Sequence, residues 1–169
     1  MIIDGQRSAD RATSTVLGYY NAFNRGDWKG MLALLSDEVA HDINQGRTER
    51  GREPFAKFLE HMARCYREEL RNVVVMSTQD GRRAAAEFVV HGEYLQTDEG
   101  LPEAKGQRYV LPAGAFFDVA PRITSRKAAV RTISMVRAEA SPYLPGERSP
   151  KPLEAKPPAT KSGLPEAMK

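Results

Sequence analysis

The stretch Tyr19-Tyr20-Asn21-Ala22-Phe23-Asn24-Arg25-Gly26-Asp27 joins the end of one expected helix to the start of the next. Apolar side chains recur at three- and four-residue spacing up to and within it: Ala12, Val16, Tyr19, Tyr20 and Phe23. Gly26 suits a left-handed helix end, and Asp27 suits the N-cap of a following helix. We therefore expect a first helix that begins at Ser8 and a short second helix directly after Asp27.

The rest of the chain predicts one more helix and then a sheet. Gly51 opens the third helix with Pro54 in its first turn. Its expected buried stripe is Phe55, Phe58, Leu59, Met62 and Tyr66. The expected strands are Glu38–Ile43, Val73–Met76, Arg83–Tyr94, Arg108–Val119 and Ala128–Val136. This order predicts an α+β fold in which three helices pack on a curved antiparallel sheet and leave a cone with an open mouth.

Composition excludes several classes of function. The net charge of +3 over 169 residues is too weak a field to indicate nucleic-acid binding. No apolar run approaches the length of a membrane helix, and the N-terminus does not have the pattern of a signal peptide. Cys65 is the only cysteine, so an internal disulfide is impossible. We expect a cytoplasmic protein that binds neither nucleic acid nor membranes.

Metal and cofactor sites are not expected either. The three histidines, His41, His61 and His91, fall on different elements with no HxH or HxxxH pair. The sequence also lacks a P-loop and a dinucleotide-binding fingerprint. We expect Cys65 to be a small buried thiol rather than a nucleophile. The chemistry, if any, should therefore come from acid–base side chains alone.

Proline marks the end of the folded domain. Seven of the 11 prolines lie at or after position 142, among lysines and few large apolar residues. Such a segment cannot bury enough apolar surface to offset its ordering entropy. We predict one domain over residues 1–136 and a Pro/Lys-rich tail over residues 137–169, disordered from about residue 140, with a proline-rich recognition ligand as the alternative.

Several motifs together resemble a known family. Tyr19–Asp27 resembles the first-helix pattern Y-x-x-A-[LF]-N-x-G-D of the nuclear transport factor 2-like superfamily. Met31–Asp42 is similar to the following segment of its SnoaL-like and ketosteroid isomerase branch, and Gly51–Phe55 to the start of the third helix. Ala85–Phe88 and Gly114–Asp118 resemble two later strands. The similarity covers about residues 12–120, and the subgroup it resembles most is that of the ketosteroid isomerase-related proteins.

The resemblance implies a conical fold with a deep pocket, often as a dimer, and assigns roles to residues. Asp42 matches the general base that removes a proton beside a carbonyl, and Tyr19 matches the tyrosine that stabilises the resulting oxyanion. The second acid of the isomerase should fall near position 113, where this chain has Ala113. A hydrophobic substrate would contact four aromatic side chains: Trp28, Phe58, Phe88 and Phe116.

The residues themselves leave alternatives open. A carboxylate in an apolar mouth has a raised pKa and becomes a usable base, but Asp42 could also be an exposed carboxylate at the end of its strand. By strand alternation His41 points to the opposite face from Asp42, and Tyr20 is expected in the core. We expect Glu87 and His91 on the outer sheet face, as a surface through which two copies pair.

These observations favour a cofactor-free, ketosteroid isomerase-like enzyme that transfers protons on a small hydrophobic carbonyl compound. The alternatives are a noncatalytic small-molecule-binding or dimeric interaction module on the same fold, and a polyketide cyclase- or dehydratase-like enzyme.

Overall fold

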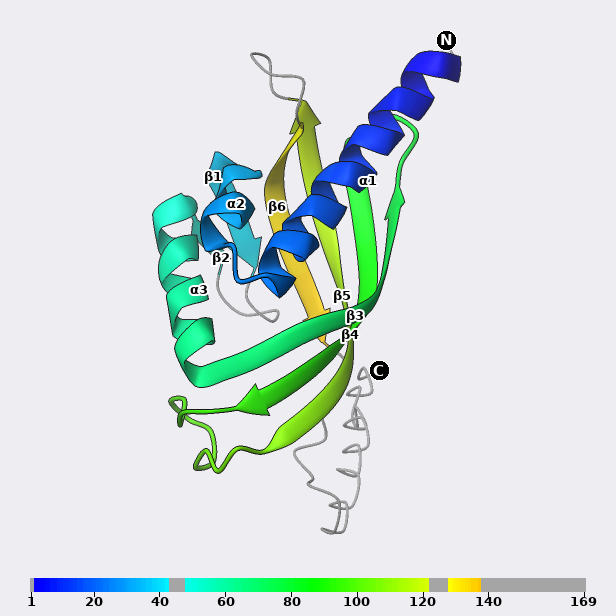
Figure 1. The fold of residues 1–169 in the computed structure, drawn as a ribbon. Helices are drawn as coiled ribbons and strands as arrows, with labels where there is room; N and C mark the ends of the chain where they lie inside the picture. Colours follow the sequence, from blue (N-terminus) through cyan, green and yellow to red (C-terminus); the bar gives the residue numbers. More distant parts are fainter. Residues whose placement is uncertain (1, 43–47, 122–127, 138–169) are drawn as a thin grey trace, which may run out of the picture.

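Three helices lie over one six-stranded sheet in the computed structural model, which describes residues 2–42, 48–121 and 128–137 (Figure 1). The helices are α1 (Ile2–Asn24), α2 (Trp28–Ala33) and α3 (Arg52–Cys65). The strands are β1 (Leu35–Asp42), β2 (Thr48–Arg50), β3 (Tyr66–Ser77), β4 (Arg83–Tyr94), β5 (Arg108–Pro121) and β6 (Ala128–Arg137). The predicted order of three helices and five strands is confirmed, with β2 as an addition that the sequence did not indicate.

The helix starts and ends follow the local signals closely. Gly26 has a φ of +65° just after α1, and the Asp27 carboxylate accepts a hydrogen bond of 2.8 Å from the backbone N–H of Gly30 at the start of α2. Several boundaries were wrong, since β1 begins at Leu35 rather than Glu38 and β3 at Tyr66 rather than Val73. α1 begins at Ile2 rather than Ser8, and Tyr66 is the first residue of β3 rather than part of the stripe of α3.

The sheet is mixed rather than purely antiparallel, which corrects the sequence-based expectation. Its strand order is β2-β1-β6-β5-β4-β3. The four later strands pair antiparallel through consecutive connections, but β1 pairs parallel with β6, with Asp42 opposite Ser134. The reason is topological: β1 precedes α3 in the chain and pairs antiparallel with the short β2 on one edge, so its other edge joins the sheet beside the last strand.

Alternation along β4 separates the core from the outer face. Ala84, Ala86, Phe88 and Val90 are buried toward the helices, while Glu87 is exposed on the other face. These buried side chains join the α1 stripe in one core cluster. The predicted assignment of the two faces of Arg83–Tyr94 is thereby confirmed.

The strand β3 is attached to α1 at two points and bends between them. At the C-terminal end of α1, the Asn24 side-chain amide donates to the Leu70 carbonyl and its oxygen accepts from the Leu70 N–H, both at 2.8 Å. Further along, Thr13 and Ser77 share a hydrogen bond of 2.9 Å. The β3–β4 register shifts between Arg71 and Val74, and Asn72 has a φ of +54°. This bulge lets β3 turn beside α1 (Figure 1).

Replacing Asn24 by alanine should loosen this attachment. Two hydrogen bonds to the β3 backbone are lost, so we expect the free energy of unfolding to fall by about 1–2 kcal/mol, measured by urea denaturation. Asn21→Ala removes an exposed amide one turn earlier on the same helix and is the control. Equal stability of the two variants would contradict a role for the Asn24–Leu70 pair.

The outer face of the sheet carries large apolar side chains in the open. Val74 and Met76 on β3 and Val110 and Phe116 on β5 are each 48–59% exposed. Ala85 lies in register between Met76 and Phe116, so the three form one row across the strands. The row of Met76, Ala85 and Phe116 is a contiguous apolar surface on this face, and such surfaces are typical of interaction sites. We propose that this face pairs with a second copy of the chain.

The substitution Phe116→Glu tests this pairing. A charge in the centre of a two-fold interface is repeated on both copies, so we expect light scattering at micromolar concentration to shift from twice the chain mass to the chain mass. Leu101→Glu, at a 51% exposed loop position, should leave the dimer intact. A monomeric unsubstituted protein would refute the proposal.

The structure bears on one of the three remaining expectations, and the other two lie outside the described residues. None of the helices among the described residues is long and apolar enough to cross a membrane. The predicted tail over residues 137–169 lies outside the described residues from position 138 onward, as does the Asn44–Gly46 turn, so both stay predictions.

Candidate functional site

A cavity lies inside the cone, between the three helices and the inner face of the sheet. Most of its lining is apolar: Phe23, Met31, Phe55, Phe58, Leu59, Met62, Leu70, Phe88, Val90 and Ile133. Four lining residues bring polar groups: Tyr19, Tyr20, His41 and Glu68. The cavity is small: its volume of about 40 Å³ has room for about three water molecules. A ring-sized ligand would therefore enter only if lining side chains moved.

Two adjacent tyrosines of α1 reach this cavity. Tyr19 and Tyr20 are each 5% exposed, and their rings meet edge to face at a centroid distance of 5.2 Å. Tyr20 also contacts Phe88 at 4.9 Å. Burial raises the pKa of both phenols, and for Tyr20 the neighbouring Tyr19 adds to the increase. Both hydroxyls thus stay protonated and can donate hydrogen bonds.

His41 is the titratable residue that β1 turns into the cavity. It is 2% exposed, and its ring meets Phe55 and Phe58 at centroid distances of 4.9 and 4.6 Å. Its Nδ1 has no hydrogen-bond partner among the described residues. Burial lowers the pKa of His41 despite the opposing effects of Glu49 and Asp42. A neutral imidazole in apolar surroundings is a candidate proton acceptor.

Asp42 lies outside the cavity, contrary to the expectation that it occupies an apolar mouth. Its Oδ1 accepts a hydrogen bond from Thr48 of β2 at 2.6 Å, and its Oδ2 accepts one from Ser134 of β6 at 2.5 Å. Those two hydrogen bonds lower the pKa of Asp42, the reverse of the expected shift. Asp42 and His41 do point to opposite faces, but it is His41 that faces the cavity.

The other expected residues divide between inside and outside. Tyr19, Phe58 and Phe88 line the cavity, whereas Trp28 is only partly buried and packs against Phe23 at 5.7 Å outside the lining. Phe116 is 59% exposed on the outer sheet face, so the prediction that it contacts substrate in the cone is wrong. Alternation explains this, because its neighbour Phe117 is the residue that points inward.

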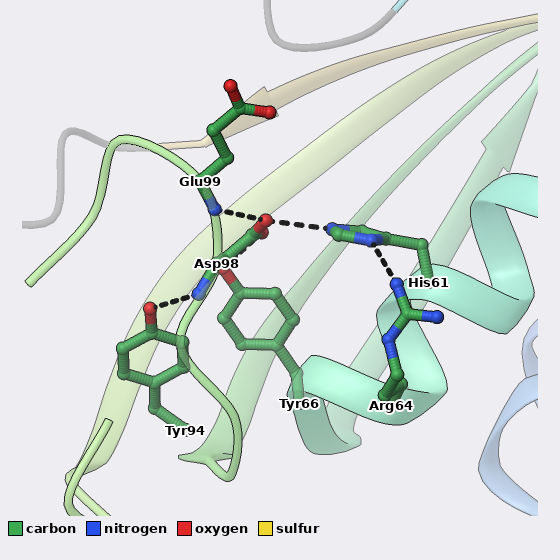
Figure 2. Close-up of polar contacts among 6 residues, drawn as sticks. All are labelled: His61, Arg64, Tyr66, Tyr94, Asp98 and Glu99. Carbon is green, nitrogen blue, oxygen red and sulfur yellow. Dashed lines mark hydrogen bonds and ion pairs between the residues drawn. The ribbon is translucent and has the colours of Figure 1, made fainter. Parts of the chain in front are cut away.

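A second polar cluster joins α3 to the loop between β4 and β5, and Figure 2 shows its members. The Tyr66 hydroxyl donates to Asp98 Oδ2 at 2.8 Å, and the Asp98 N–H donates to the Tyr94 hydroxyl at 2.6 Å. His61 Nε2 lies 3.0 Å from Asp98 Oδ1. We call His61, Tyr66, Tyr94 and Asp98 the loop clasp.

The loop clasp is built for hydrogen bonding rather than for a metal ion. His61, Cys65 and Asp98 place potential ligand atoms within 4.8 Å of one another. However, Arg64 lies 3.1 Å from His61 Nδ1, and a guanidinium has no acceptor, so Nδ1 must accept. The imidazole proton then sits on Nε2 and is donated to Asp98. A cation at Nε2 would have to displace that proton. Moving the proton to Nδ1 would then break the contact with Arg64.

Comparison with known proteins places this geometry in a family. The family model of the SnoaL-like domain matches residues 16–125. The chain belongs to the SnoaL-like domain family. Among curated proteins, none matches the chain. In this SnoaL-like domain the matched segment includes the tyrosines of α1, His41, Glu68 and the loop clasp, whereas β6 lies beyond it.

Solved structures support the same assignment. A proposed polyketide cyclase from Xanthomonas campestris pv. campestris is 53% identical, with a TM-score of 0.70, covering 76% of this chain and 90% of that one. Another, from Pseudomonas putida KT2440, is 55% identical, with a TM-score of 0.67 and coverage of 74% and 90%. A nuclear transport factor 2-like protein from Burkholderia xenovorans LB400 shares 16% identity over 77% of this chain and 91% of its own, with a TM-score of 0.54. The last likeness shows the fold alone.

The loop clasp generates a stability prediction. Partial burial acts to raise the pKa of Asp98, but the hydrogen bonds from His61 and Tyr66 outweigh it and lower that pKa. Asp98→Asn should therefore reduce the free energy of unfolding at pH 7 by about 1–3 kcal/mol, measured by urea denaturation. A lowered folded-state pKa stabilises above the unfolded value of about 3.9, so the difference should shrink as pH falls below about 4.

The neighbouring Glu99→Gln is the control, because its side chain is exposed and takes no part in the clasp. A difference between wild type and Asp98→Asn that is independent of pH would mean that shape rather than charge matters at Asp98.

Proposed function

We propose that this SnoaL-like domain is an enzyme that removes a proton beside the carbonyl of a small hydrophobic compound, with His41 as the base. The observation that carries the proposal is the buried Nδ1 of His41, which has no hydrogen-bond partner among the described residues, in a cavity that Tyr19 and Tyr20 also line. A base and hydrogen-bond donors in one apolar enclosure are the parts that enolisation needs.

The chemistry follows from the protonation states. The neutral imidazole takes the α-proton, and the C–H electron pair moves to the carbonyl oxygen to form an enolate. A tyrosine hydroxyl with a raised pKa stays protonated and donates to that oxygen. Tyr19 is the donor that the family resemblance assigns. The imidazolium then returns its proton to a carbon of the enolate or to an oxygen of the product.

Two outcomes share this first step. If the enolate is reprotonated at another carbon, the reaction is an isomerisation. If its carbon attacks a second carbonyl of the same molecule, a carbon–carbon bond forms and the reaction is a cyclisation. Two solved relatives, at 53% and 55% identity, are described as proposed polyketide cyclases, which supports the second outcome for this chain. Ala113, partly buried against the core, supplies no second acid of the isomerase kind.

Asp42 is less well supported as the base. It is hydrogen-bonded to β2 and β6 on the face away from the cavity, and its lowered pKa makes it a weaker proton acceptor. Its contacts favour a role in holding three strands together. Since His41 and Asp42 are neighbours on β1, their variants form a matched pair.

Exchange of α-protons for deuterium tests the proposal without knowledge of the natural substrate. The wild-type protein should accelerate loss of the C2 proton signal of 1-tetralone, a small bicyclic ketone, in deuterated buffer followed by NMR. His41→Gln should slow this exchange by about 10²–10⁴-fold, and Tyr19→Phe by about 10²–10³-fold. Asp42→Asn should exchange at close to the wild-type rate.

The pH profile separates the two bases. Because burial lowers the pKa of His41, its imidazole stays neutral below the ordinary value of about 6.5, and exchange should be lost only as pH falls through that lower folded-state pKa. The same shift means that folding stability declines as pH falls below about 6.5. Loss of exchange in Asp42→Asn but not in His41→Gln, with both variants folded by thermal melting, would reverse the assignment.

A noncatalytic binding module is the second candidate. The absence of a second acid at Ala113 favours it, because stabilisation of an enolate would then depend on the tyrosines of α1 alone. Binding of ring ketones with no exchange above the buffer rate in the wild-type protein would make this the better account.

A further inference from the structure

His41 has a carboxylate residue as its neighbour on the adjoining strand. β1 lies between β2 and β6, and the partners of His41 in register are Glu49 of β2 and Ile133 of β6. Directly opposite residues of paired strands carry their side chains on the same face of a sheet. Glu49 therefore lies beside His41 on the inner face, on the edge strand, while Ile133 lines the cavity on the other side.

The burial of β2 agrees with this placement. Glu49 is partly buried, whereas Thr48 and Arg50 on either side of it are exposed. Thr48 donates its hydrogen bond to Asp42 on the face away from the cavity, so alternation turns Glu49 to the inner face. Glu49 is not among the described residues that line the cavity. It stands behind His41, where it can act on the imidazole without touching a bound molecule.

The other surroundings of the His41 ring are largely apolar. Phe55 and Phe58 of α3 meet it at centroid distances of 4.9 and 4.6 Å. Burial lowers the pKa of His41, and of the two carboxylates that act against burial, Glu49 raises that pKa more than Asp42 does. Three further titratable side chains line the same cavity: Tyr19, Tyr20 and Glu68.

A carboxylate in this position matters at the moment of proton transfer. When His41 takes a proton, a positive charge forms in apolar surroundings, which is costly unless an opposite charge is near. The field of Glu49 offsets part of that cost and makes the imidazole a stronger base. This effect needs no hydrogen bond between the two side chains, because charges interact over several ångströms.

Resting on the proposed function, we propose that Glu49 is the positioning residue of the base, and that its carboxylate stabilises the imidazolium formed when His41 removes the α-proton. The proton moves from the substrate carbon to His41, the C–H electron pair moves to the carbonyl oxygen, and Glu49 stays ionised throughout. A carboxylate supports the histidine of hydrolytic triads by the same physical effect. The short strand β2 then has a function, since it carries this carboxylate to the side of β1.

Titration of His41 tests the pair without any substrate. The imidazole C–H signals would be followed by NMR as pH is lowered, with the His41 signal assigned by its loss in His41→Gln. In Glu49→Gln the proton affinity of His41 should fall about 10-fold, because an opposite charge no longer favours the imidazolium. Glu49→Asp keeps the charge and should restore most of the affinity. Glu38→Gln removes a charge from an exposed position of β1 and should leave the titration unchanged.

Exchange of 1-tetralone protons tests the role in the reaction. Glu49→Gln should lower kcat by about 3- to 10-fold, because the base is weaker, while KM stays within about 2-fold. The acidic limb of the pH profile should move to lower pH by the same amount as the titration. A purely structural loss would lower the rate without moving this limb. Glu49→Asp should recover most of both effects.

The two experiments fail independently. An unchanged titration of His41 in Glu49→Gln, or an equal change in Glu38→Gln, would overturn the role of Glu49. A weakened proton affinity in Glu49→Gln with no exchange by the wild type would uphold the pair and refute the proposed function. Exchange by the wild type, with an acidic limb that does not move in Glu49→Gln, would leave His41 as the base and remove Glu49 from the mechanism.

Discussion

The attachment of β3 to α1 is the constraint on which the shape of the interior depends. From Asn24 to Thr13 the helix advances about 16 Å, whereas Leu70 to Ser77, the partners of those residues, would span about 23 Å as a straight strand. The strand therefore cannot lie straight between its two attachment points. The bulge around Asn72, with its positive φ, absorbs the excess length and turns the strand.

That turn is what leaves a hollow. A flat sheet would press its inner face evenly against α1, but a sheet bent at the edge strand lifts its remaining strands away from the end of the helix. Tyr19 and Tyr20 lie toward this end of α1, and both line the remaining space. Asn24 and Asn72 therefore act together in shaping the cavity, although almost fifty positions separate them in the sequence.

The sequence was sufficient for much of the fold because its signals there are local. The stripe of α1, Gly26, Asp27 and the limits of β4 each follow from residues within one element. The parallel pairing of β1 with β6 could not be predicted in this way, since it depends on which free sheet edge β1 meets after the chain has folded around α3. The strand β2 is three residues long, too short for any period to appear.

The site was predicted less well because two of the residue assignments were made to the wrong face of a strand. On a strand, a shift of one residue exchanges the two faces, so His41 and Asp42 trade places, as do Phe116 and Phe117. The family pattern indicated a carboxylate at Asp42, but the bulge between Leu35 and Ala40 shows that β1 does not keep one simple alternation from end to end. The sequence signal that could have found His41 is the pair of consecutive apolar residues before it, Val39 and Ala40. Both are buried in the structure, so the two-residue alternation of β1 is already broken there. Glu68 carried no such signal, since it stands in the charged run Arg67-Glu68-Glu69 and only its cross-strand neighbours distinguish it.

The cross-strand pairs of β3 and β4 also show where polar side chains lie on the inner face of the sheet. Successive rows along β3 and β4 change from Leu70 and Val90, to Glu68 and Gly92, to Tyr66 and Tyr94. The last pair stacks at 5.3 Å and holds Asp98, which in turn meets His61 on α3 (Figure 2). Polar groups therefore begin at Glu68, at the border of the cavity, and continue to the loop clasp. Because the clasp joins α3 to the sheet across the β4–β5 loop, the helix that supplies Phe58 and Met62 to the cavity cannot swing away as a rigid body while the clasp holds. Enlargement of the cavity then falls to side chains, and the unbranched Met62, with three rotatable bonds, is the lining residue on α3 best suited to yield.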